Sequence, residues 1–95
     1  MHMREFQQLM KQLYLHRDEK RGIKGTYNWL VDEVQELGEA LETNNQEAVM
    51  NECADVIAWL SSLSNVIGID LERATLRKYN GKCPKCQFSP CKCEF

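Results

Sequence analysis

Apolar residues recur at helical spacing along most of this chain. Residues 4–20 carry one such stripe, and the two glycines of the "RGIKG" stretch at 21–25 interrupt it. A second stripe runs from about Asn28 to Leu41, and we expect Thr26 or Asn28 to cap the start of that helix. The apolar positions are Phe6, Leu9, Met10 and Leu13 in the first stripe, then Leu30, Val34, Leu37 and Leu41 in the second.

Two more helices are expected after the "TNN" stretch. Asn44, with Glu47 three residues later, resembles a capping box, so the third helix should run from about Gln46 to Ile67. Gly68 follows it as a C-terminal cap. Because this helix is apolar on most sides, we expect it to be the central and most buried one, through Val49, Met50, Ala54, Val56, Ile57, Leu60 and Leu63.

A fourth, shorter helix should begin after Asp70, its N-cap, and extend to about Tyr79. No stretch alternates like a strand, so the predicted fold class is all-α. The short turn between the second and third helices predicts an antiparallel helical hairpin with flanking helices. We expect a helical domain over residues 1–80 and a short Cys-rich C-terminal tail over residues 81–95.

The chain is small, with 95 residues. A domain of this size buries only about 60–65% of its unfolded surface, so oligomerisation or a metal is expected to add stability. The N-terminal sequence "MHMREFQQLM" lacks the long apolar stretch of a signal peptide, and no run approaches the roughly 20 apolar residues of a membrane helix. We therefore expect a cytoplasmic protein without a membrane partner.

Charge is segregated along the sequence, although the formal net charge is only −2. All twelve Lys and Arg residues lie in residues 1–24 or 73–95, whereas residues 25–72 hold ten acidic residues and no Lys, Arg or His. Most of these acids fit a solvated surface. Glu52 and Asp55 do not, because they interrupt the apolar stretch "NECADVIAWL".

Four carboxylates are expected to face one another across the hairpin. Glu33 and Glu36 are three residues apart, as are Glu52 and Asp55, so each pair shares one helix face. Counted from the turn at Asn44, Glu36 and Glu52 are both eight residues away, and Glu33 and Asp55 are both eleven away. The two pairs should therefore lie opposite each other.

Crowded carboxylates in a partly dry site must be neutralised. The hairpin has no cation of its own, which leaves a metal or salt bridges from the flanking segments, unless the acids are simply solvated. An all-oxygen set suits Mg²⁺ or Mn²⁺. A di-iron centre would need Glu-x-x-His pairs, and the only histidines are His2 and His16. The metal hypothesis assigns Mg²⁺ (or Mn²⁺) to Glu33, Glu36, Glu52 and Asp55.

A nucleotide pocket is expected at the same end of the hairpin. Trp29 and Trp59 are both fifteen residues from Asn44, so they should stand about 6 Å beyond the carboxylates. Their rings can stack a base, although they suit a core equally well. The N-terminus of the second helix favours anions. Cations that can hold phosphates there, or else form a solvated surface, are Lys20, Arg21, Lys24, Arg73, Arg77 and Lys78.

The motif "WLVDEVQEL" followed by "NECADVIAWL" resembles the paired ExxE and ExxD signature of the MazG-like nucleoside triphosphate pyrophosphohydrolases, within the all-α NTP pyrophosphatase superfamily. The resemblance covers about Arg17 to Asn80. The family commonly has Glu before the first signature Glu and Gly two residues after it, where this chain has Asp32 and Gln35. Carried over by position, the Mg²⁺ ligands would be Glu33, Glu36, Glu52 and Asp55.

The resemblance implies hydrolysis of a nucleoside or deoxynucleoside triphosphate to the monophosphate and pyrophosphate, in nucleotide-pool cleansing. Lys78 and Asn80 of "RKYNGK" lie where the family often has phosphate-contacting residues. Family members usually form homodimers or homotetramers in which hairpins pair into four-helix bundles and share parts of each pocket. One alternative is hydrolysis of phosphoribosyl-ATP, and another is a non-catalytic helical module that binds a partner protein or nucleic acid. The absence of cations from residues 25–72 favours the enzyme.

The tail contains a C-x₂-C-x₄-C-x-C pattern. Four thiolates at this spacing in a reduced compartment indicate a structural Zn²⁺ site, with disulfides, free thiols or an iron–sulfur cluster as alternatives. Three lysines in the tail would offset the thiolate charge, but they are weak support for nucleic acid as a partner. Cys53 is expected to be a small core residue. The zinc ligands would be Cys83, Cys86, Cys91 and Cys93.

Overall fold

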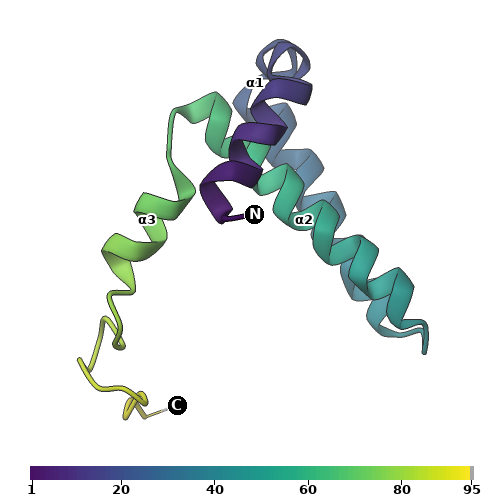
Figure 1. Cartoon of the computed structure of the whole chain (residues 1–95). Helices are drawn as coiled ribbons and strands as arrows, with labels where there is room; N and C mark the ends of the chain where they lie inside the picture. Colours follow the sequence, from purple (N-terminus) through teal and green to yellow (C-terminus); the bar gives the residue numbers. More distant parts are fainter. Residues whose placement is uncertain (95) are drawn as a thin grey trace.

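The computed structural model describes residues 1–94, which form three helices followed by a tail without regular structure (Figure 1). The helices are α1 (Met3–Leu41), α2 (Gln46–Ile67) and α3 (Leu71–Lys78). No strand occurs among residues 1–94, so the all-α prediction is confirmed. Over the same residues no single helix is long and apolar enough to cross a membrane. The combination of α2 and α3 meets that length and composition, but the two are bent by 98°.

α1 joins the first two predicted helices around one sharp bend. Only Gly22 is non-helical, with φ +80° and ψ 178°, a backbone conformation that glycine adopts readily. The predicted break within residues 21–25 is confirmed at Gly22, but the predicted cap at Thr26 or Asn28 is wrong. Thr26 lies inside the helix with its side chain fully buried. Its Oγ1 has no hydrogen-bond partner within residues 1–94, so Thr26 does not act as a cap.

The bend at Gly22 divides α1 into a first part, residues 3–21, and a second part, residues 23–41. Both parts pack against α2 (Figure 1). α2 is capped by Asn45, whose Oδ1 accepts a hydrogen bond from the Ala48 N–H at 3.2 Å, one residue later than the predicted Asn44. The predicted caps Gly68, which is left-handed with φ 75°, and Asp70, which accepts a hydrogen bond from the first turn of α3, are confirmed.

A buried amide fastens the start of α1 to the junction between α2 and α3. The Gln7 Nε2 donates to Asn65 Oδ1 at 3.0 Å and to the Ile69 carbonyl at 2.7 Å. The Gln7 Oε1 accepts from the Leu71 N–H at 2.9 Å. One side chain thus satisfies polar groups of three segments and fixes where α3 begins.

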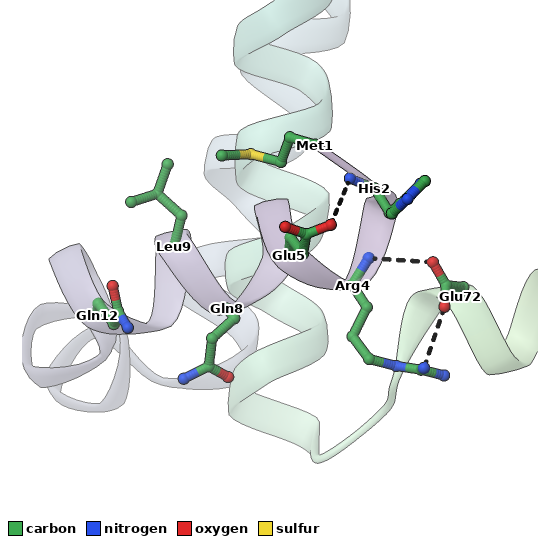
Figure 2. Close-up of a pocket in the computed structure, with 8 residues that line it drawn as sticks. All are labelled: Met1, His2, Arg4, Glu5, Gln8, Leu9, Gln12 and Glu72. Carbon is green, nitrogen blue, oxygen red and sulfur yellow. Dashed lines mark hydrogen bonds and ion pairs between the residues drawn. The ribbon is translucent and has the colours of Figure 1, made fainter.

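Arg4 adds ion pairs between α1 and α3. Its Nε donates to Asp70 Oδ2 at 2.8 Å, and its Nη1 lies 3.1 Å from Glu72 Oε2 (Figure 2). Beyond these contacts α3 and the tail extend away from the α1–α2 pair (Figure 1). The tail is therefore a separate part of the chain rather than a cover for the helices.

Few apolar side chains are buried within the single chain. In residues 1–94 only Met10 and Ala40 are buried hydrophobic residues. α2 is the most buried of the three helices, as predicted, because a larger share of its residues is shielded from solvent than in α1 or α3. The sequence predicts Met50 and Ile57 in the core, however, and they are 65% and 51% exposed. Cys53 is exposed as well, not part of a core. These residues are exposed because α1 covers one side of α2, and no other segment within residues 1–94 covers the opposite side.

Candidate functional site

Three of the four predicted carboxylates meet between the second part of α1 and α2. One oxygen from each of Glu33, Glu36 and Glu52 lies within 4.8 Å of the other two. We call these three side chains the carboxylate cluster. Glu33 is buried, Glu52 is half-buried and Glu36 is exposed, so the cluster opens to solvent on one side. Asp55 lies beside the cluster. Burial is the main cause of the raised pKa of Glu33, and Asp55 is near enough for its charge to contribute.

The turn between α1 and α2 sets the register of this site. Trp29 of α1 and Trp59 of α2 are equally far from the turn, and their rings stack with centroids 5.3 Å apart and planes at 9°. Glu33 and Glu36 follow Trp29 by one and two helical turns, and Glu52 precedes Trp59 by two, so the carboxylates meet next to the aromatic pair. Residue spacing on two helices is enough to build this arrangement.

The cluster lacks compensating positive charge. Burial raises the pKa of Glu33 to about 7, helped by its hydrogen bond to Glu36 and by the charges of Glu36, Asp55 and Glu52. Burial is also the main cause that raises the pKa of Glu52, and the charges of Glu36 and Asp55 raise it further. None of the ion pairs within residues 1–94 involves these four side chains. Flanking salt bridges therefore do not neutralise the acids in the described chain.

The donor atoms suit a divalent cation. In residues 1–94 the Oε2 atoms of Glu33 and Glu52 are buried without a hydrogen-bond partner. Oxygens in an octahedral Mg²⁺ shell lie about 2.1 Å from the ion and so about 3–4 Å from one another. The separations within the carboxylate cluster, up to 4.8 Å, need only small side-chain movements to reach that range. The assignment of these residues as ligands stays a prediction.

Of the three predicted cations Lys20, Arg21 and Lys24 around the bend of α1, only Arg21 contacts the aromatic pair. Its Cζ lies 4.7 Å from the centroid of the Trp59 ring, and its Nη1 donates to Asp18 Oδ1 at 2.8 Å. Lys20 and Lys24 are exposed on the helix surface. A Cβ at position 25 would lie 2.7 Å from the Arg21 Cγ, so Gly25 leaves room for this side chain.

A cavity of about 270 Å³ lies between the first part of α1 and α2, next to the carboxylates. This volume is close to the lower end of small-molecule pockets. Sequence reasoning missed Asp18, which is 1% exposed and whose Oδ2 has no partner within residues 1–94. The three-residue spacing between Asp18 and Arg21 could have indicated this ion pair. Asp18 lies in the charged stretch "HRDEK", however, and such a stretch usually indicates a solvated surface. The polar and aromatic residues of the cavity are Tyr14, Arg17, Asp18, Arg21, Asp55, Trp59 and Ser62.

A larger cavity, of about 580 Å³, lies at the N-terminal end of α1 (Figure 2). Its two acids already have partners: Glu5 accepts a hydrogen bond from the His2 N–H at 3.1 Å, and Glu72 pairs with Arg4. The cavity therefore offers no free carboxylate for a metal ion. The smaller cavity beside the carboxylate cluster is the better candidate site.

The remaining predicted residues lie apart from the carboxylate cluster. Lys78 and Asn80 are exposed and line a surface cavity of about 390 Å³ at the end of α3, together with Lys82. Because α3 extends away from the α1–α2 pair, the single chain does not place them against the acids (Figure 1). In the tail the sulfur atoms of four cysteines all lie within 4.8 Å of one another. They belong to Cys83, Cys86, Cys91 and Cys93.

The geometry is that of an all-helical protein with an acidic site between two helices and aromatic rings beside it. Residues 21–87 match the family model of the MazG nucleotide pyrophosphohydrolase domain, and the chain belongs to this family. The matched region contains the carboxylate cluster, Asp55 and both tryptophans. A search of curated proteins finds no match to the chain.

Proposed function

We propose that this protein hydrolyses nucleoside or deoxynucleoside triphosphates to the monophosphate and pyrophosphate, with Mg²⁺ (or Mn²⁺), and thereby cleanses the nucleotide pool. The main support is the carboxylate cluster in a MazG domain, with two buried oxygens that lack a partner within residues 1–94. Such a cluster attracts a divalent cation, and cations of this kind bind substrate phosphates.

Glu33, Glu36, Glu52 and Asp55 would hold the metal. When bound, the ion would offset phosphate charge and lower the pKa of the attacking water. A carboxylate that the metal leaves free would accept the proton from that water. The raised pKa of Glu33, caused first by its burial, fits a carboxyl group whose ionised form a bound cation would favour.

The aromatic pair and the neighbouring cations would bind the rest of the nucleotide. Trp29 is 48% exposed, so its ring is accessible for stacking against a base. Arg21 lies against Trp59 at the cavity and would contact the base or the sugar phosphate. Lys20 and Lys24, exposed nearby on α1, would attract the triphosphate as it approaches.

We propose a homodimer or homotetramer as the active form. The support is the small core together with the exposed apolar residues of α2, such as Met50 and Ile57, which a second copy would cover. The same assembly would allow Lys78 and Asn80 of one copy to reach phosphates held by another. It would thereby bring together residues that the single chain keeps apart.

The test is a substrate panel with Mg²⁺ in which products are separated and identified. We expect pyrophosphate from at least one nucleoside or deoxynucleoside triphosphate. Glu52→Gln should lower kcat/KM about 100-fold or more, equivalent to about 3 kcal/mol of transition-state stabilisation. Glu47→Gln is the matched control, because Glu47 lies on the same helix in its first turn, outside the carboxylate cluster.

Three results would overturn the proposal. Hydrolysis of phosphoribosyl-ATP alone would favour the related activity in the same superfamily. Intact triphosphates across the panel, with helical protein and Mg²⁺ present, would favour a non-catalytic binding module. Equal activity of Glu52→Gln and the wild type would show that the reaction occurs elsewhere on the protein.

A further inference from the structure

The tail holds a second group of metal-binding side chains, apart from the carboxylate cluster. Cys83 and Cys93 have their Sγ atoms 3.7 Å apart, and Cys86 and Cys91 have theirs 3.8 Å apart. All four sulfurs lie within 4.8 Å of one another. We propose that these four thiolates bind one tetrahedral Zn²⁺ ion, and that this ion maintains the fold of residues 81–94.

The sulfur separations match a tetrahedral metal shell. A Zn–S bond of about 2.3 Å places two sulfurs of a tetrahedron about 3.8 Å apart. A disulfide would need about 2.0 Å. Both observed pairs are at the tetrahedral separation, and each uses one cysteine from the first half of the tail and one from the second. A central ion would therefore connect the two halves.

Backbone hydrogen bonds support the thiolates. The Lys92 N–H donates to Cys86 Sγ, and the Cys93 N–H donates to Cys91 Sγ, each at 3.3 Å. Donors of this kind orient metal-bound thiolates and offset their charge. The second bond also explains how the tight C-x-C step fits one ion, because it holds the Cys91 sulfur beside the backbone of Cys93.

The loop between the first two cysteines has a fixed shape. The Cys83 N–H donates to the Phe88 carbonyl at 3.1 Å, and the Gln87 N–H donates to the Cys83 carbonyl at 2.8 Å. The Gln87 side chain donates to the Pro84 carbonyl at 3.1 Å. These bonds close a turn that places the Cys83 and Cys86 sulfurs on the same side.

The described tail has little else to hold it together. Residues 81–94 include no buried side chain, and their hydrogen bonds are all made within the tail. Ordering a backbone costs about 1–2 kcal/mol per residue. A structural Zn²⁺ supplies about 10–16 kcal/mol in small zinc domains, enough to offset much of that cost. Nearby cations Lys82, Lys85 and Lys92 would balance the net negative charge of four thiolates and one Zn²⁺.

The experiment measures metal in the full-length protein purified under reducing conditions. We expect one Zn²⁺ per chain, and replacement by Co²⁺ should give the intense visible absorption of tetrahedral cobalt thiolates. The double variant Cys86→Ser/Cys91→Ser should lose both. Cys53→Ser is the matched control, because Cys53 is exposed on α2 outside the tail group, and it should keep the full zinc content.

Far-UV circular dichroism separates zinc loss from misfolding, because the tail contains no helix. The double variant should retain the helical signal of the wild type, and amide exchange should rise only in residues 81–94. If the double variant misfolds, titration of the wild-type thiols with a mercurial should release the zinc in step with four thiols. Glu52→Gln should keep its zinc, so failure of the hydrolase proposal does not affect this test.

The proposal fails if the wild-type protein contains only trace zinc, or if the double variant binds as much as the wild type. Two disulfides among these four cysteines, found in protein freshly purified under reducing conditions, would also overturn the proposal. Equal amounts of iron and inorganic sulfide, with the corresponding brown colour, would assign an iron–sulfur cluster instead.

Discussion

Replacement of Glu33 by Gln should stabilise the metal-free protein above pH 7. Burial, the hydrogen bond to Glu36 and the surrounding negative charges raise the pKa of Glu33 from 4.5 to about 7 in the folded state. The unfolded chain releases this proton near its ordinary pKa of about 4.5. Between these two pH values the folded state binds more protons than the unfolded state, so the free energy of unfolding falls as pH rises.

The size of the effect follows from the same pKa difference. A pKa difference of about 2.5 units corresponds to at most about 3.4 kcal/mol of unfolding free energy. Water reaches the carboxylate cluster through exposed Glu36, and screening should reduce this to about 1–2 kcal/mol. Glutamine has nearly the same shape, carries no charge and can still donate to Glu36. Glu33→Gln should therefore be more stable than the wild type by that amount near pH 8.

The assay is urea unfolding followed by circular dichroism, at one protein concentration, from about pH 5 to 8 with EDTA. The Cys-rich tail is common to both proteins, so loss of its metal cancels in the comparison. Added Mg²⁺ should reverse the order, because the wild type gains binding free energy that the variant lacks. Glu39→Gln, at an exposed position on the same helix, should behave like the wild type. An equal pH dependence for Glu33→Gln and the wild type would refute the reasoning.

Two further predictions concern the helices around the site. Gly38→Ala should stabilise the protein by about 0.5–1 kcal/mol, because a Cβ there meets nothing within 4 Å. In the same urea assay Gly25→Ala should gain less stability than Gly38→Ala, or lose stability, because its Cβ would displace Arg21 from Trp59. A gain equal to that of Gly38→Ala would contradict this contact. Met50→Lys should reduce the mass measured by light scattering after gel filtration, and an unchanged oligomer would exclude this face of α2 from the interface.

The meeting of the carboxylates could be predicted from the sequence because it depends on local quantities. Spacing within a helix fixes which side chains share a face, and the length of one turn fixes which residues lie opposite. The stacking of Trp29 on Trp59 follows from the same count. Asp55 shows the limit of this reasoning, because residue counting predicts it opposite Glu33, whereas the structure leaves it beside the carboxylate cluster and not within it.

Tertiary contacts decide the features that the sequence did not predict. Nothing local distinguishes Gly22, which bends α1, from Gly25, which stays helical beneath the Arg21 side chain. Asp18 is buried only because the bend brings the first part of α1 against α2. The apolar pattern of α2 identifies the residues that avoid water, but it does not say whether the same chain or a second copy covers them.

The bend at Gly22 separates the two parts of α1, and each part contributes different residues to the candidate site. The first part carries Asp18 and Arg21 at the cavity, and the second part carries Glu33 and Glu36. A change in the bend angle would widen or narrow the cavity, whereas the spacing of the acids depends on the turn to α2. Under the proposed function, substrate choice and hydrolytic chemistry could therefore diverge separately as such sequences evolve.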